Sequence, residues 1–327
     1  MSTPHAAADA SSRHRIVVIG GGNAGLSVAG RLRHAGISDI AVIDPNDTHY
    51  YKPLFSHVAG GTAKASETMR AQADVIPKGV DWIQGSVTSV DADAHEVRLA
   101  SGATVAYEHV IVCPGIVHDW DTIPGLTDAM RSPEGASNYE LDLAVKASAL
   151  LRDVRGGTVV FVQASGPASC AGAAQKPMYT TEEHLAYDVL LVEPPQSAPK
   201  WIGESGLASE PGGFVDVDVR TLRSSTHPDV WALGDAAATT NSKSGGALRK
   251  QTKILADNLL SVLSGREPTA HYDGYGVCPF TVSRSTPSSP SSTTSDDSPP
   301  RCGARPTGRA AVRGSSTAGC SLRSTGT

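Results

Sequence analysis

The stretch RIVVIGGGNAGLSVAGRLRHAG, residues 15–36, combines three features in a fixed order. A short apolar strand over residues 15–19 is followed by the spacing G-x-G-x-x-G, formed by Gly20, Gly22 and Gly25, and then by a helix-like run. In this arrangement the first glycine permits a tight turn, the second lets the backbone approach a pyrophosphate, and the third lets the helix pack against the strand. The N-terminus of the helix would then present N–H groups and partial positive charge to the phosphates. The stretch therefore predicts a dinucleotide-binding βαβ unit.

An acidic residue follows at the expected place. A second apolar strand, residues 40–43, ends at Asp44, which comes 24 positions after Gly20. A carboxylate there can accept hydrogen bonds from an adenosine ribose. The glycine triplet alone would also fit a turn without a ligand, but the strand, the helix and the acidic residue together favour a dinucleotide site.

The rest of the chain alternates strand-like and helix-like segments. The strand-like segments are residues 80–99, 107–115, 157–163, 187–192, 213–222 and 229–235, of which 80–99 and 213–222 are typical of hairpins. The helix-like segments are residues 136–154 and 246–265. This alternation predicts an α/β, Rossmann-like fold with one parallel sheet and smaller antiparallel additions.

Composition limits the classes of function. The chain has 327 residues, a net charge of −5 and five cysteines. The charge gives no reason to expect nucleic-acid binding, and no apolar run is long enough to span a membrane. No two cysteines form a CxxC pair, so we expect no metal site. The first residues, MSTPHAAADASSRHR, lack an apolar signal core, which predicts a disordered leader over residues 1–12 and an intracellular protein with free or catalytic thiols.

The stretch THPDVWALGDAA, residues 226–237, is an apolar strand that ends in Gly234 and Asp235 and continues into a helix. It resembles the second FAD-binding motif of the two-dinucleotide-domain flavoprotein disulfide reductases. By that resemblance Gly234 and Asp235 bind FAD, with Asp235 on the ribityl chain of the flavin. FAD is therefore the expected cofactor.

The segment VIVCPG, which ends at Gly115, resembles the crossover segment of the same flavoproteins. The resemblance implies that Gly115 contacts the cofactor. We interpret Cys113, inside this segment, as a small buried apolar residue rather than a reactive thiol.

A nicotinamide site would need a second G-x-G-x-x-G turn after the strand over residues 157–163. The sequence there is ASGPASCAGAAQKP, which has Gly166 and Gly172 but no G-x-G spacing. This disfavours an NADH-linked enzyme, and an NADH:quinone-type flavoprotein stays as an alternative.

Seven separated segments occur in the order of the sulfide:quinone oxidoreductase family and resemble its two-cysteine type, which includes the mitochondrial enzymes. They are HYYKPLFSHVAGG, VIPKGVDWIQGSV, VIVCPGIVHDWDTIPGL, GPASCAGAAQKPMY, VEPPQSAP, LGDAAATTNSKSGGALRKQ and YDGYGVCPFTVSRS. The resemblance implies an enzyme that oxidises sulfide at a cysteine pair and passes two electrons through FAD to a membrane quinone. It assigns the redox roles to Cys170 and Cys278, and it places Lys52, Pro53 and Val87 at cofactor-binding positions.

Four other residues of these segments are less informative. His49 and His57 flank the segment HYYKPLFSH, where a packing role is as good an explanation as a functional one. Lys243 and Lys250 precede or begin the last helix-like segment and would equally suit a solvated surface.

The chain departs from the family in the middle. Only TTEEHLA lies between Tyr179 and Tyr187, where the family carries most of a second α/β lobe of about a hundred residues. Strands that lose their neighbours expose edges and apolar faces. We therefore expect a truncated, poorly packed second lobe over residues 126–199.

The second departure follows Arg284, where the family continues with apolar segments that bind the membrane and line the quinone pocket. Of the last 43 residues of this chain, 23 are Ser, Thr or Pro, a composition that cannot bury a core. We expect a disordered tail over residues 285–327, typical of a GC-rich gene read out of frame. Such a tail would not bind the membrane as the family does, which would leave the chain cytoplasmic.

These inferences predict a discontinuous FAD-binding domain over residues 13–125 and 200–284. The partners expected from the resemblance are sulfide and a quinone, and the sequence is compatible with a homo-oligomer. A non-catalytic FAD-binding fragment is the second alternative to the sulfide-oxidising enzyme.

Overall fold

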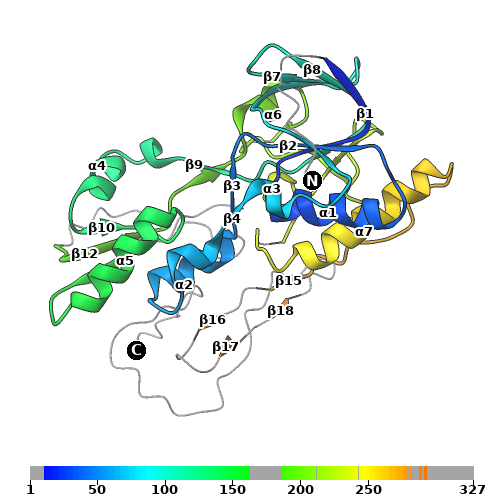
Figure 1. Cartoon of the computed structure of the whole chain (residues 1–327). Coiled ribbons are helices and arrows are strands. Elements are labelled where there is room, and N and C mark those ends of the chain that lie inside the picture. Colours follow the sequence, from blue (N-terminus) through cyan, green and yellow to red (C-terminus); the bar gives the residue numbers. More distant parts are fainter. Residues whose placement is uncertain are drawn as a thin grey trace, which may run out of the picture.

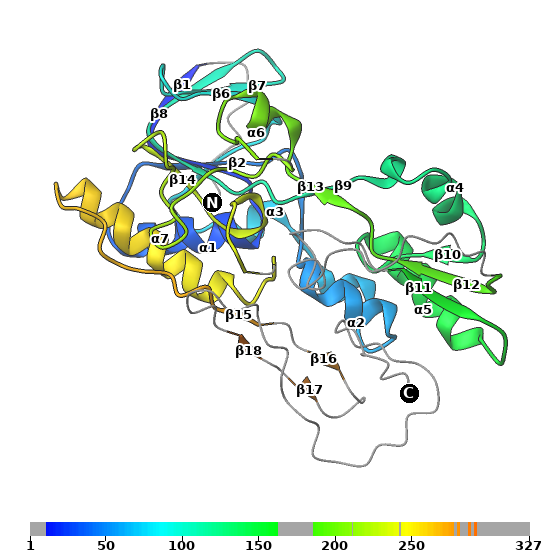
Figure 2. The ribbon, with the colours of Figure 1, turned by 180° about the vertical axis from the view of Figure 1, so that it is seen from behind.

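The computed structural model describes residues 11–162, 186–210, 212–241 and 243–277, together with the backbone of three short strands between residues 280 and 292. Figures 1 and 2 show a large part built on one sheet and a smaller part beside it. Cys170 and Cys278, the two predicted redox cysteines, lie outside the described residues.

The large part is built on a seven-stranded sheet in the order β5-β2-β1-β8-β7-β6, with β14 also paired to β8. The pairs β5–β2, β2–β1, β1–β8 and β8–β14 are parallel, and β8–β7 and β7–β6 are antiparallel. The predicted α/β fold with a parallel sheet and antiparallel additions is confirmed. The strands are β1 Ser12–Ile19, β2 Ile40–Ile43, β5 Asp81–Ile83, β6 Val87–Asp91, β7 Glu96–Leu99, β8 Thr104–Val112 and β14 Val230–Ala232.

The central strand β1 is buried on both faces. Ile16 and Val18 belong to the apolar cluster on the face covered by the helices α1 (Asn23–His34) and α7 (Leu248–Leu263), whereas Val17 and Ile19 belong to the cluster on the opposite face. Successive side chains of a strand point to opposite faces, so a strand covered on both sides is apolar throughout. Figures 1 and 2 show α1 and α7 together below the sheet.

The small part holds a parallel three-stranded sheet in the order β10-β12-β11. Two chain segments, β9 and β13, pair with each other in antiparallel fashion between the small and the large part. The strands are β9 Val117–His118, β10 Gly135–Ala136, β11 Val159–Val162, β12 Val189–Val192 and β13 Gln196–Ser197, and the helices are α2 Phe55–Ala59, α4 Leu126–Arg131 and α5 Leu141–Asp153.

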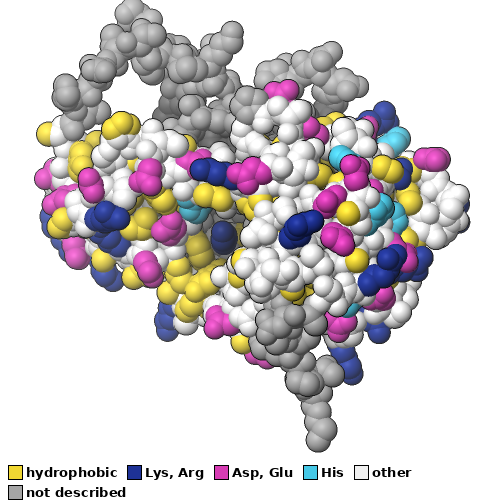
Figure 3. Space-filling view, turned by 90° about the horizontal axis from the view of Figure 1, so that it is seen from above, with side chains coloured by type: hydrophobic (Ala, Val, Ile, Leu, Met, Phe, Trp, Pro, Cys, Tyr) yellow, Lys and Arg dark blue, Asp and Glu magenta, His cyan; other side chains and the backbone are white. Residues whose placement is uncertain are grey.

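The strand β11 lies at the edge of this small sheet and is poorly covered. The side chains of Phe161 and Val162 are 46% and 39% exposed, respectively. In Figure 3 hydrophobic side chains are visible on the left of the molecule, the side of the small part. Exposed apolar faces of this kind are what the sequence predicts for strands without their neighbours.

The expected hairpin over residues 213–222 is only partly formed. Val215 and Val217 make isolated bridges, to Ala237 and Ser224. Leu222 has a left-handed φ of 64° and lies in the turn between Val217 and Ser224. The remaining elements are short: η1 Lys52–Leu54, η2 Ala65–Thr68, η3 Trp120–Thr122, η4 Gly234–Ala236, α3 Gln72–Val75, α6 Lys200–Glu204, β3 Thr48–Tyr50, β4 Met69–Ala71, β15 Gly276–Val277, β16 Phe280–Thr281, β17 Pro287–Ser288 and β18 Ser291–Ser292.

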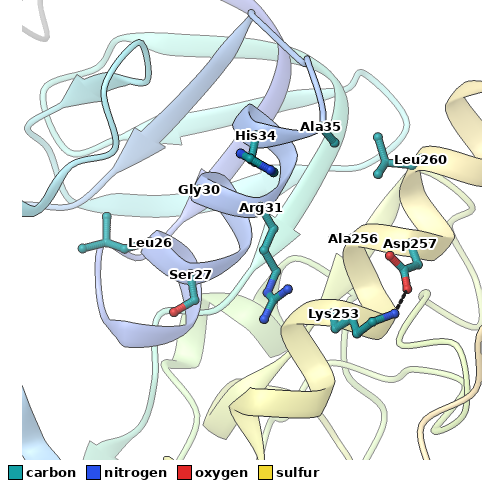
Figure 4. Close-up of a pocket in the computed structure, with 10 residues that line it drawn as sticks. All are labelled: Leu26, Ser27, Gly30, Arg31, His34, Ala35, Lys253, Ala256, Asp257 and Leu260. Carbon is teal, nitrogen blue, oxygen red and sulfur yellow. Dashed lines mark hydrogen bonds and ion pairs between the residues drawn. The ribbon is translucent and has the colours of Figure 1, made fainter.

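The helices α1 and α7 enclose a surface groove of about 480 Å³. Figure 4 shows Arg31 on α1 and the ion pair of Lys253 with Asp257 on α7 (2.6 Å) along it. None of the residues predicted to bind the cofactor lines this groove. Among the described residues, no helix is both long and apolar enough to cross a membrane.

Candidate cofactor-binding site

The turn after β1 is packed directly against the segment that follows β8. A Cβ atom on Gly20 would stand 2.4 Å from the carbonyl oxygen of Cys113, and one on Gly25 would stand 1.9 Å from the carbonyl oxygen of Gly20. Gly20 also has a φ of 108°, which side chains other than glycine rarely adopt. The backbone N–H of Cys113 donates to the carbonyl of Ile19 at 2.9 Å. These two glycines are therefore required for the turn to close on its neighbours.

Gly22 differs, because a Cβ there would meet no atom within 4 Å. It is the residue before α1, it has extended backbone, and no side chain caps the helix. The first turn of α1 also carries no acidic residue. Uncapped N–H groups and the helix dipole favour an anion at this end. The open space beside Gly22 and the free donors of α1 thus fit a dinucleotide pyrophosphate.

Asp44 is fixed beside this turn. One carboxylate oxygen accepts a hydrogen bond from the backbone N–H of Gly21 at 2.7 Å, and the other accepts from the backbone N–H of Asn46 at 2.9 Å. The indole N–H of Trp82 donates to the Asp44 carbonyl at 3.1 Å. An ionised carboxylate has further lone pairs, so Asp44 can still accept from a ribose hydroxyl. The role of Asp44 at the adenosine ribose stays a prediction.

Two residues hold the same turn without having been predicted to do so. The side-chain amide of Gln72, which is almost fully buried, donates to the carbonyl of Gly21 at 2.9 Å. The His49 ring nitrogen Nδ1 is 3.1 Å from the same carbonyl oxygen. His49 therefore has a contact with the turn, whereas the partly buried His57 lies on α2 and is 3.3 Å from the hydroxyl of Thr62.

The second predicted FAD-binding motif, residues 226–237, lies near the glycine turn, because β14 and β1 both pair with β8. Gly234 follows β14 with a φ of 71°, and its N–H donates to the buried side-chain oxygen of Gln251 on α7 at 2.9 Å. Asp235 is partly buried. Burial raises the pKa of the Asp235 carboxyl, and the ammonium groups of Lys243 and Lys52 oppose that rise. The Asp235 carboxylate, which follows the parallel strand β14, is therefore influenced by the positive charges of Lys243 and Lys52.

Lys243 and Lys250 have different surroundings. Lys243 is partly buried, and its ammonium donates to the carbonyl of Ala237 at 2.6 Å. Burial lowers the pKa of Lys243 to about 8, against the attraction of Asp235. Lys250 forms an ion pair with Asp273 at 2.5 Å and its side chain is 44% exposed. Of these two lysines, only Lys250 therefore has the solvated surface position that the sequence also allowed.

The other predicted cofactor-binding residues lie as follows. Gly115 has a φ of 83° and open space around its Cβ position. Pro53 on η1 would be 2.9 Å from a Cβ on Gly245, so η1 meets the loop before α7. Lys52 is exposed and acts on Asp235 through its charge. Val87 begins β6 and packs against the core on the face opposite α1.

The described thiol, Cys113, is 5% exposed, and burial raises its pKa far above the ordinary range. This agrees with its interpretation as an apolar packing residue. Within the described part of the chain, no group of three or more His, Cys, Asp or Glu side chains is arranged to hold a metal ion.

Comparison with known proteins agrees with this geometry. Residues 14–160 match the family model described as pyridine nucleotide-disulphide oxidoreductase. The mitochondrial sulfide:quinone oxidoreductases of Mus musculus and Dictyostelium discoideum are each 27% identical over alignments that include 83% of this chain and 76% of theirs. Over most of its length the chain is therefore similar to sulfide:quinone oxidoreductases. It is therefore a flavoprotein oxidoreductase whose cofactor is FAD.

A solved structure shares the fold. The sulfide:quinone oxidoreductase from Aquifex aeolicus superposes with a TM-score of 0.70 over 81% of both chains, at 16% sequence identity. At that identity the likeness concerns the fold alone.

Proposed function

We propose that this chain oxidises sulfide at the pair Cys170 and Cys278 and passes the electrons to a quinone. The observation that carries the proposal is a contact beside Cys278. A Cβ on Gly246 would stand 2.1 Å from the Val277 side chain and 2.5 Å from the Val277 carbonyl oxygen. The residue before Cys278 therefore packs against the loop that joins Asp235 to α7.

The residues at the turn would hold FAD in the orientation of the family. The N–H groups of α1 next to Gly22 would bind the pyrophosphate, Asp44 would accept from the adenosine ribose, and Asp235 would accept from the ribityl chain. When bound there, FAD supplies a two-electron acceptor.

The cysteines would carry the sulfur chemistry. Hydrosulfide attacks one sulfur of a Cys170–Cys278 disulfide, so that a new S–S bond forms, the disulfide breaks, and the other cysteine leaves as a thiolate. A nucleophile of the thiol or sulfite class then removes the outer sulfur of the persulfide and leaves a second thiolate. Re-oxidation of the two thiolates to the disulfide releases two electrons, which balances the oxidation of one sulfide to the sulfane level.

The length of one alignment indicates that this chain lacks segments present in a relative. The alignment to the Mus musculus enzyme extends over 343 positions, more than the 327 residues of this chain, although it includes only 83% of them. The relative therefore carries segments that the chain lacks. We place the missing segment between Tyr179 and Tyr187, as part of a second lobe left over residues 126–199, and we expect turnover to be impaired.

The test is anaerobic addition of sulfide to the purified, FAD-loaded protein while the visible absorbance of the flavin is recorded. The proposal predicts that sulfide bleaches the flavin and that NADH does not. Bleaching by NADH alone would indicate the NADH:quinone-type alternative. A protein that takes up no FAD would correspond to the non-catalytic alternative and would contradict the proposal.

A further inference from the structure

The chain segment that leads to Cys278, residues 270–277, is anchored to the helix α7 at its start. The side chain of Asn258 on α7 is fully buried. It accepts a hydrogen bond from the backbone N–H of Ala270 at 2.8 Å and donates to the Ala270 carbonyl at 2.9 Å. It also donates to the carbonyl of Thr221 at 3.1 Å. Displacing Ala270 would leave this buried amide without these partners, so the segment starts from a fixed point.

The middle of the segment is held at two further places. Tyr272 is buried, its backbone N–H donates to the carbonyl of Arg220 at 2.7 Å, and its hydroxyl donates to the carbonyl of Tyr275. The ammonium of Lys250, in the first turn of α7, forms an ion pair with Asp273 at 2.5 Å and lies 4.7 Å from the centre of the Tyr275 ring. The segment is therefore attached to both halves of α7.

The end of the segment packs against Gly246, two residues before α7. A Cβ on Gly246 would stand 2.1 Å from a methyl carbon of Val277 and 2.5 Å from the Val277 carbonyl oxygen. Non-bonded carbon atoms are most stable about 3.5–4.0 Å apart, so there is no room for a side chain. The φ of Gly246 lies outside the left-handed region. Glycine is therefore required here by the contact with Val277 and not by the backbone conformation.

We propose that Gly246 is a positioning residue for Cys278. Because Gly246 has no side chain, the backbone of Val277 lies directly against the loop before α7, which sets the position of the next residue relative to Cys170 and FAD. The inference rests on the proposed sulfide oxidation at Cys170 and Cys278. Since the start and the middle of the segment are anchored, a methyl group on Gly246 would displace Val277 and, with it, Cys278.

A displaced Cys278 would strain its disulfide with Cys170. The Cα atoms of two bonded cysteines are usually about 4.4–6.8 Å apart, and departures from this geometry make the bond easier to reduce. Two glutathione thiols reduce the disulfide to two protein thiols and form one molecule of glutathione disulfide. In Gly246→Ala we expect this equilibrium to shift towards the protein dithiol by roughly tenfold or more. Flavin reduction by sulfide should slow by roughly a hundredfold, the cost of misplacing a reacting group by about 1 Å.

The experiment equilibrates the full chain, with and without FAD, in glutathione buffers of graded redox potential. Peptide mapping then measures the fraction of chains that hold the Cys170–Cys278 disulfide. Gly203→Ala is the matched control, because a Cβ on Gly203 would meet no atom within 4 Å and its φ also lies outside the left-handed region. Gly203→Ala should match the wild type, whereas Gly246→Ala should hold the disulfide only in more oxidising buffers.

A kinetic measurement on the FAD-loaded proteins follows flavin bleaching by sulfide and, separately, by dithionite. Dithionite reduces the flavin without the cysteines, so we expect equal rates in the wild type, Gly203→Ala and Gly246→Ala. With sulfide, only Gly246→Ala should be slow. A loss of rate with both reductants would mean that the methyl group disturbs the flavin itself, and would contradict a role through Cys278.

The outcomes separate the inference from the function on which it rests. If Gly246→Ala has a lower melting temperature but the disulfide equilibrium of the wild type, the contact only stabilises the fold and the inference is overturned. A wild type that forms no Cys170–Cys278 disulfide in any buffer would reject the cysteine pair itself.

If Gly246→Ala does not fold, the comparison is made in the Val277→Ala background, where the nearest methyl group is absent. The contact with the Val277 carbonyl oxygen remains there. Adding Gly246→Ala to Val277→Ala should therefore still shift the equilibrium towards the dithiol, and an unchanged equilibrium would contradict the proposal.

Discussion

Gly20 and Cys113 are in backbone contact: a Cβ on Gly20 would stand 2.4 Å from the Cys113 carbonyl oxygen. This contact joins the turn after β1 to the segment after β8, and so brings together two of the motifs that we propose form the FAD site. Neither backbone can retreat, because both follow adjacent strands of the central sheet.

Gly20→Ala should therefore prevent stable folding. The added methyl meets backbone atoms and the residue has a φ of 108°, so we expect a loss of about 4 kcal/mol or more in the free energy of unfolding. Gly36→Ala is the control, because Gly36 has a φ of 97° but open space around its Cβ position. Its cost should be limited to backbone strain, about 1–3 kcal/mol. Urea unfolding of the two variants measures the difference, and equal losses would contradict the contact.

Gly22→Ala should behave in the opposite way. Its Cβ would meet no protein atom and its backbone is already extended, so the melting temperature without FAD should stay near that of the wild type. FAD binding should be strongly weakened, because the methyl group would occupy the space assigned to the pyrophosphate. Circular dichroism and FAD titration test this pair of results. Wild-type FAD affinity would show that the pyrophosphate does not approach Gly22.

Cys113 should be inert in the folded protein. Burial raises the pKa of its thiol, and thiolates, not thiols, react with alkylating reagents. Peptide mapping after treatment with iodoacetamide should find Cys113 unmodified in native protein and modified in urea. Rapid labelling of Cys113 under native conditions would refute its role as a packing residue.

The charge of Lys243 should reduce the stability of the FAD-free protein. The pKa of Lys243 is about 8 in the folded state, against an ordinary value of 10.5 that we expect in the unfolded chain. Between pH 8 and pH 10.5 the folded chain therefore binds fewer protons than the unfolded chain. The free energy of unfolding consequently increases with pH in this range. We expect a rise on the order of 1–3 kcal/mol, discounted for partial exposure. Urea unfolding of wild type and Lys243→Met from pH 7.5 to 9.5 measures it; an identical rise in the variant would contradict this assignment.

Local patterns in the sequence predicted the turn and its surroundings well. The strand, the three glycines and Asp44 lie within one continuous stretch, so their spacing alone indicates a βαβ unit. The resemblance to a known motif implied that Gly234 and Asp235 bind FAD, but no local pattern predicted that β14 pairs with β8.

Residues that support the site from a distance were not predictable. Gln72 reaches Gly21 across 51 positions, and Gln251 reaches Gly234 from the opposite side of a loop. No spacing rule connects them, because only the packed fold brings them together. The burial of Lys243 likewise follows from the position of the Phe214 ring, 29 residues earlier.

The most direct test of sulfide oxidation at the cysteine pair is an anaerobic sulfide titration of FAD-loaded variants, with the flavin absorbance as readout. We predict that wild type and Cys113→Ser are bleached equally, whereas Cys170→Ser and Cys278→Ser are not bleached at all. Cys113→Ser is the matched control, because it removes one thiol outside the proposed pair. Bleaching of Cys170→Ser or Cys278→Ser at the wild-type rate, or no bleaching of the wild type, would contradict the central claim.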